Sequence, residues 1–78
     1  MMDQKLVKLA ANLFKMGTDD INPSLTMNDV EAWDSLKHME LIGLIEKNYE
    51  IELTFAEIGE MVTLGNINEI VTKRLAGK

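Results

Sequence analysis

The amino-acid sequence predicts an all-α fold: a small four-helix bundle of three main helices and one short helix, with a long loop between the first two helices. The chain has 78 residues, which suits one small domain. Apolar residues make up 46% of it and aromatic residues only 5%, so aliphatic side chains have to build the core. Their spacing follows the helical period along most of the chain, and no segment requires a β-sheet.

The first helix is predicted over residues 3–16. Its apolar residues recur at i, i+3, i+4, i+7 and i+8, as expected of a helix with one buried face: Leu6, Leu9, Ala10, Leu13 and Phe14. Asp3 is the expected N-cap, and Gly17 is the expected helix stop.

Residues 17–34 are predicted to form a long loop, because turn-forming residues, including the only proline, Pro23, dominate them. A loop of this length in so small a domain is unusual and is often functional. Four apolar side chains are the expected anchors, and the last of them is expected to pack its ring on the bundle: Ile21, Leu25, Val30 and Trp33.

The second helix is predicted from Ser35 to about Tyr49. Its apolar residues form two stripes displaced around the helix axis: Leu41, Ile45 and Tyr49 on the first, and Leu36, Met39 and Gly43 on the second. A surface helix needs only one stripe for the core, so we expect the first to be buried. The second stripe begins beside Ser35 and is left for a partner.

The third helix is predicted to be short, about two turns, and to begin with a capping box formed by Thr54 and Glu57. Ile51 and Leu53 precede it in an extended connection. Its inward side chains are expected to be Phe55, Ile58 and either Met61 or Val62.

The last helix is predicted over residues 64–76. Its expected core face consists of Ile67, Ile70, Val71 and Leu75. The basic residues Lys73, Arg74 and Lys78 suit the negative end of its dipole.

The charge and the missing residue types exclude several classes of function. The net charge of −5 argues against a nucleic-acid partner, which needs a basic face, and favours basic patches on other proteins. With no Cys and one His, we expect no disulfide, no thiol chemistry from the chain itself and no His/Cys metal site. No apolar run approaches membrane-spanning length, and no signal peptide is evident. We therefore expect a cytoplasmic monomer, without membrane insertion, that is too small to be an enzyme.

The informative motif is the triplet Asp34-Ser35-Leu36, which stands where the long polar loop enters an apolar helix. A three-residue match alone is weak. In this order of elements and at this length, however, the whole chain resembles the acyl carrier protein family, which includes the peptidyl carrier domains. The resemblance covers nearly all 78 residues and implies a single carrier domain over residues 1–78.

The resemblance implies that Ser35 receives 4′-phosphopantetheine from coenzyme A through a phosphopantetheinyl transferase. The thiol of this arm then carries acyl or aminoacyl groups as thioesters to acyl-loading, condensing or transferring enzymes. Asp34 would help the transferase to orient the site, and Leu36 would touch partner enzymes. The expected partner face of the second helix consists of Leu36, Met39, Glu40, Gly43 and Glu46.

Elementary chemistry agrees with this resemblance. A phosphodiester at a helix N-terminus meets unpaired amides and the positive end of the helix dipole. A chain without Cys has to obtain a reactive thiol from a cofactor. Gly43 has two possible roles: either it lets a partner approach the helix closely, or it has no such role and only weakens the helix.

Other interpretations of these residues remain open at this point. Ser35 could be a plain N-cap, which contributes about 1 kcal/mol, in an unmodified helical interaction module with a carrier-like fold. His38 has no matching nucleophile or carboxylate dyad, so we expect it to be solvent-exposed or partner-facing rather than catalytic. Asp19 and Asp20 are expected to form an ordinary solvated turn rather than a metal site.

The chain departs from the pattern of fatty-acid carriers near the triplet. Those carriers usually have a strongly acidic second helix, whereas Lys37 and His38 follow the triplet here, and Lys47 comes late in the helix. Trp33 also replaces the small residue that is common before the triplet. These differences favour a specialised pathway over housekeeping fatty-acid synthesis. The aliphatic core also suggests that a long acyl tail slips between the helices.

Overall fold

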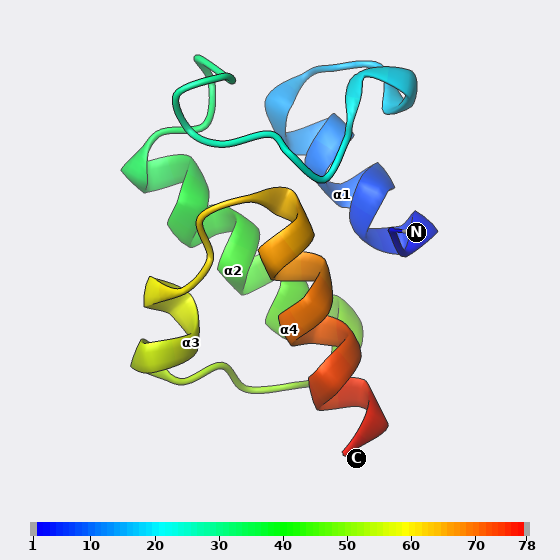
Figure 1. The fold of residues 1–78 in the computed structure, drawn as a ribbon, viewed down its shortest axis with the longest axis vertical. Coiled ribbons are helices and arrows are strands. Elements are labelled where there is room, and N and C mark those ends of the chain that lie inside the picture. The colour runs from blue at the N-terminus through cyan, green and yellow to red at the C-terminus, as the bar shows by residue number, and fades with distance from the viewer. Residues whose placement is uncertain (1, 78) are drawn as a thin grey trace.

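The computed structural model describes residues 2–77, and helices are the regular elements of this part of the chain. Their order is α1 (Gln4–Phe14), the 3₁₀ turn η1 (Thr18–Asp20), α2 (Ser35–Tyr49), α3 (Phe55–Gly59) and α4 (Leu64–Ala76). In Figure 1, α4 runs close to the long axis of the molecule, α2 crosses it obliquely, α3 lies to one side, and the loop between α1 and α2 covers one end. The predicted all-α bundle is confirmed.

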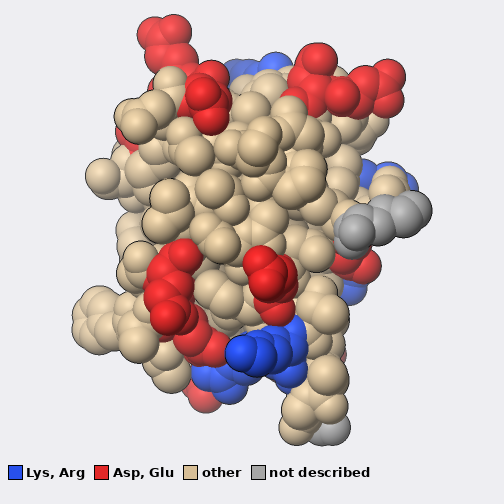
Figure 2. Space-filling view, in the orientation of Figure 1, with Lys and Arg blue, Asp and Glu red and all other residues tan. Residues whose placement is uncertain are grey.

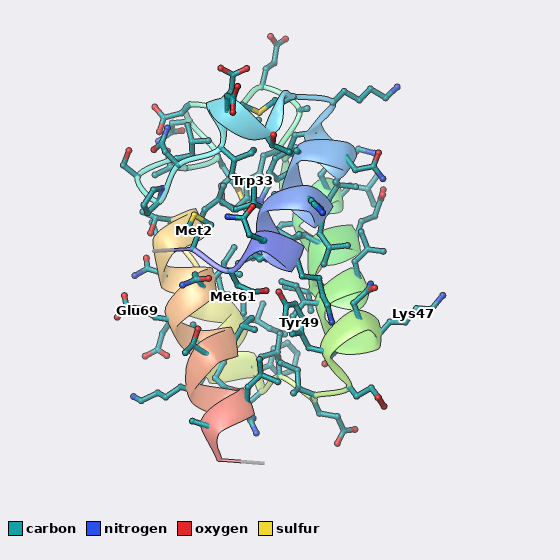
Figure 3. All side chains as sticks on the ribbon, turned by 90° about the vertical axis from the view of Figure 1, so that its right-hand side faces the viewer. Met2, Trp33, Lys47, Tyr49, Met61 and Glu69 are labelled. Atoms are coloured by element: carbon teal, nitrogen blue, oxygen red, sulfur yellow. The ribbon has the colours of Figure 1, made fainter. Side chains whose placement is uncertain are left out.

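The core consists mostly of aliphatic side chains, together with the rings of Phe14, Trp33 and Tyr49. Figure 3 shows Trp33 near the loop and α1, with Tyr49 and Met61 farther toward the C-terminal end of the bundle. The first stripe of α2 is buried as predicted, since Leu41, Ile45 and Tyr49 all lie in the core. No helix within residues 2–77 combines the length and the apolar character that crossing a bilayer requires.

The first helix ends earlier than predicted, and Gly17 is not its stop. Lys15 closes α1 in the left-handed conformation (φ 56°), while Gly17 has an ordinary φ of −70°. The turn at Lys15 lets the Met16 amide donate to the Ala11 carbonyl at 2.9 Å and brings the Met16 side chain onto the core. A backbone bond and apolar packing therefore offset the left-handed conformation of a non-glycine residue.

The four predicted anchors of the loop are confirmed. Ile21, Val30 and Trp33 are buried, and Leu25 packs against the core in a half-buried position. Hydrogen bonds fix the same loop to the first turn of α4, because the amides of Leu64 and Gly65 donate to loop carbonyls at 3.1 and 2.9 Å. The loop thus satisfies amides that the start of a helix otherwise leaves unpaired.

The capping box of Thr54 and Glu57 is confirmed, but α3 spans only five residues and Phe55 does not point inward. Leu53, Ile58 and Met61 fill the core side of this segment, which leaves Phe55 outside with 95% of its surface exposed. Met61, rather than Val62, is the buried member of that pair.

The last helix has the predicted bounds, and Ile67 and Val71 are buried in the core as expected. Leu75 is exposed, contrary to the expectation. The last turn of α4 extends beyond the other helices (Figure 1), which is consistent with the exposure of Leu75 near its end. Lys78 lies outside the described residues.

Candidate functional site

The start of α2 is capped by Asp34 and not by Ser35. The Lys37 amide donates to the Asp34 carboxylate at 2.9 Å, and the His38 amide donates to the Asp34 carbonyl at 2.8 Å. Asp34 has an extended backbone (φ −103°, ψ −173°), as expected of an N-cap, so Ser35 is the first helical residue. The interpretation of Ser35 as the cap of this helix is therefore wrong.

Because Asp34 supplies the cap, the Ser35 side chain is left for other chemistry. Ser35 is exposed, and within residues 2–77 its hydroxyl makes no hydrogen bond. The amides of Ser35 and Leu36 belong to the first turn, where no carbonyl lies one helical turn back to accept from them. A phosphodiester on the Ser35 oxygen would thus meet unpaired N–H groups at the positive end of a 15-residue helix.

The second stripe of α2 is exposed beside this hydroxyl. Leu36 and Met39 leave 70% and 57% of their surfaces accessible, and Glu40 and Gly43 are also exposed. Large apolar side chains this exposed on a helix surface can enter pockets of a partner. These four residues form an open face that begins at Ser35.

Glu46 differs from the other residues expected on the partner face. Its carboxylate accepts the Leu53 amide at 2.9 Å, and the side chain is half-buried. Glu46 therefore ties α2 to the connection that leads into α3, which the spacing along α2 alone did not reveal.

The net negative charge of the molecule comes from the loop between α1 and α2. Residues 17–34 hold five of the 13 acidic residues and none of the eight Lys and Arg, so the rest of the chain is neutral. Figure 2 shows acidic side chains at the loop end of the molecule, which is uppermost in that view. On α2 itself the charges are mixed, and Lys37 pairs with Glu40 at 3.5 Å. An attractive field for a basic partner thus comes from the loop that leads into Ser35.

His38 is buried, so the expectation that it faces solvent or a partner is wrong. Only 8% of its surface is exposed, and its Nδ1 accepts a hydrogen bond from the Trp33 indole N–H at 3.1 Å. The reason is its position, because residue 38 precedes Leu41 and Ile45 by three and seven residues and so continues the core stripe. That spacing was the available signal for its burial.

Burial also changes the acid–base behaviour of His38. It lowers the pKa of the imidazole from 6.5, because the charged form loses hydration. The backbone carbonyl of Ile58 on α3 acts in the opposite direction, since it favours a protonated ring. His38 is thus a neutral core residue at neutral pH and not an exposed base.

Comparison with known proteins agrees with this geometry. The family model described as "Phosphopantetheine attachment site" matches residues 4–72, a range that includes the Asp34-Ser35-Leu36 triplet. The solution NMR structure of the holo acyl carrier protein from Geobacter metallireducens superposes with a TM-score of 0.84 at 30% sequence identity. The match covers 94% of this chain and 84% of that chain. A search among curated proteins found no match.

Proposed function

The chain belongs to the phosphopantetheine-attachment family of acyl carrier proteins, and from this premise we propose that Ser35 bears its 4′-phosphopantetheine arm. The arm's thiol would hold acyl or aminoacyl groups as thioesters and present them to partner enzymes. The observation that carries the proposal is the exposed Ser35 hydroxyl at the first turn of α2, which has no hydrogen-bond partner among residues 2–77, since Asp34 caps the helix. The protein positions the group, and the arm supplies the reactive sulfur.

Attachment would be a phosphoryl transfer to the Ser35 oxygen. The bond from this oxygen to the phosphorus of coenzyme A's pantetheine phosphate forms as the diphosphate bond breaks, and adenosine 3′,5′-bisphosphate leaves. The serine proton passes to a base of the transferase, because His38, the one imidazole of the chain, is buried. The helix amides and dipole favour the negative phosphodiester that results.

The proposed partner face combines the acidic loop with the open face of α2. Loop carboxylates would attract a basic surface, and Leu36 and Met39 would enter its apolar pockets, while Gly43 would allow close approach. Glu40 lies on the same face but pairs with Lys37. Asp34 would serve both as the helix cap and as a contact for the transferase.

The proposed pathway is a specialised one rather than housekeeping fatty-acid synthesis. Its support is the mixed charge of α2, where Lys37 and Lys47 interrupt the acidic residues. A partner enzyme that recognises a uniformly acidic helix would be attracted less strongly to α2 of this protein. The cargo follows from the pathway and would be an acyl or aminoacyl thioester.

Incubation with coenzyme A, Mg²⁺ and a phosphopantetheinyl transferase tests the attachment. The intact protein should gain the mass of one phosphopantetheine, and Ser35→Ala should gain none. Ser24, the only other serine, lies in the same loop, so Ser24→Ala is a matched control that should still be modified. An unchanged mass of the parent protein would support an unmodified interaction module instead, and modification of Ser35→Ala would place the arm elsewhere.

A further inference from the structure

A buried hydrogen bond joins the two sides of the Ser35 turn. The indole N–H of Trp33, two residues before Ser35, donates to Nδ1 of His38, three residues after it, at 3.1 Å. Trp33 is 1% exposed and stacks on Phe14 of α1, with ring centroids 5.2 Å apart. The pair therefore links the end of the loop to the first turn of α2 and rests on α1.

The hydrogen bond also determines which nitrogen of His38 carries the proton. Since Nδ1 accepts from Trp33, it has to be unprotonated, and the ring N–H of the neutral form is then at Nε2. The backbone carbonyl of Ile58 on α3 also acts on the ring, since it favours the protonated form. The imidazole thus joins the loop end to α2 through a hydrogen bond and is influenced by α3, three residues after the proposed attachment site.

We infer that His38 is a positioning residue for Ser35: as the neutral acceptor of the Trp33 indole N–H, it holds the loop end and α2 in the arrangement in which Asp34 caps the helix and the Ser35 hydroxyl faces outward. The inference rests on the proposed attachment at Ser35. Without that acceptor, a buried N–H would have no partner, and the loop end would have to move so that the indole reaches water.

The arrangement predicts a dependence on pH. Protonation of Nδ1 replaces the acceptor by a second donor, so the Trp33–His38 bond and a charged imidazole exclude each other. Several charged groups on the loop end, α2 and α3 have other partners: Asp34 caps α2, Lys37 pairs with Glu40, and Glu57 pairs with Arg74. α1 contributes the uncharged Phe14 to the pair. Burial is then the main influence on the pKa of His38. Because burial lowers this pKa, the imidazole stays neutral at neutral pH and the Trp33–His38 hydrogen bond is retained.

The chain allows a clean test, since it contains one Trp and one His. His38→Asn retains an acceptor oxygen near the position of Nδ1 and does not titrate, whereas His38→Leu retains bulk without an acceptor. We expect His38→Leu to lower kcat/KM for phosphopantetheine transfer at least about fivefold, and His38→Asn to stay within about twofold of the parent. Trp33→Phe, which keeps the stack on Phe14 and removes the donor, should behave like His38→Leu. Circular dichroism confirms that each variant is folded under the assay conditions.

The pH profile separates positioning from packing. Between about pH 5 and pH 8, the rate ratio of parent to His38→Asn cancels the titration of the transferase itself. This ratio should fall at low pH, with the midpoint at which the histidine and indole N–H resonances of the unmodified protein shift together in NMR spectra.

Three results would overturn the positioning role: normal transfer by His38→Leu, equal losses in His38→Leu and His38→Asn, or a pH-independent ratio. A parent protein that accepts no arm at all refutes the proposed function instead. The NMR titration still reports in that case whether the pair opens with protonation.

Discussion

The Asp34 carboxylate accepts a hydrogen bond from the Lys37 amide at 2.9 Å, and this bond decides the role of Ser35, the residue that follows Asp34. It provides the helix cap, so the hydroxyl of Ser35 is not needed for that purpose. The same aspartate would stand beside the arm when a transferase approaches.

Two substitutions at Asp34 separate capping from recognition. Asp34→Asn keeps a side-chain oxygen that can cap the helix, whereas Asp34→Ala removes it and should lower the free energy of unfolding by about 1 kcal/mol. If Asp34 also contacts the transferase through its charge, Asp34→Asn will slow phosphopantetheine transfer without loss of stability. Urea unfolding and intact-mass time courses measure the two effects. Equal transfer rates in Asp34→Asn and the parent would restrict Asp34 to capping.

The exposed stripe of α2 should matter to partners and not to folding. Leu36→Ala removes a side chain that is 70% exposed, so the unfolding midpoint should stay nearly unchanged. If Leu36 enters a pocket of a partner enzyme, the KM of that enzyme for the carrier should rise roughly tenfold, which corresponds to about 1.4 kcal/mol. Phe55→Ala on α3 is the matched control, because it removes another exposed apolar side chain outside the proposed face. A larger KM effect at Phe55 than at Leu36 would move the partner face to α3.

The loop approaches the start of α4 so closely that a side chain at residue 65 would crowd Pro23. A Cβ at Gly65 would lie 3.0 Å from both the carbonyl oxygen and the Cβ of Pro23. Gly65→Ala should therefore destabilise the protein by about 1–3 kcal/mol despite the better helix propensity of alanine. Gly43→Ala, where a Cβ meets open space, should instead stabilise α2 by up to about 1 kcal/mol. Urea unfolding of both variants checks the contrast, and a stable Gly65→Ala protein would show that the loop yields easily.

An ion pair between α3 and α4 should give the protein an acid-sensitive contribution to stability. Arg74 donates to both carboxylate oxygens of Glu57, at 2.8 and 2.6 Å, and these hydrogen bonds are the main reason that the pKa of Glu57 falls from 4.5 to about 2. A depressed carboxylate pKa stabilises the fold above the unfolded value of 4.5, and this contribution is lost as the pH falls toward 2.

Arg74→Met tests that ion pair. Its thermal midpoint should lie below that of the parent at neutral pH, and the difference should shrink as the pH is lowered from about 5 toward 2. Glu57→Gln, which keeps the shape of the carboxylate, should show the same pattern. A difference that stays constant over this range would mean that packing of the Arg74 side chain, rather than charge, stabilises α3.

Local patterns predicted much of this fold. The period of apolar residues predicted the bounds of α2 and α4. The capping box of Thr54 and Glu57 could be recognised in the sequence because its two partners lie within one helical turn. The candidate site at Ser35 came from the resemblance to a family and not from periodicity. The open positions of Leu36 and Met39 followed from the second stripe of α2.

The features that sequence reasoning missed depend on distant residues. His38 continues the core stripe, but its hydrogen-bond partner is the indole of Trp33, which the loop brings to it. The role of Glu46 depends on the path of residue 53 after the helix has ended. Phe55 lies outside because other apolar side chains already fill the core below α3. None of these relationships lies within the single turn of helix that a periodic pattern describes.

Attachment at Ser35 is tested most directly by the mass of the protein purified from its own host, followed by fragmentation of the peptide that contains residue 35. We expect one phosphopantetheine, free or loaded with cargo, attached to Ser35. A protein that is unmodified in a host with an active transferase, or an arm attached to Ser24, would contradict it.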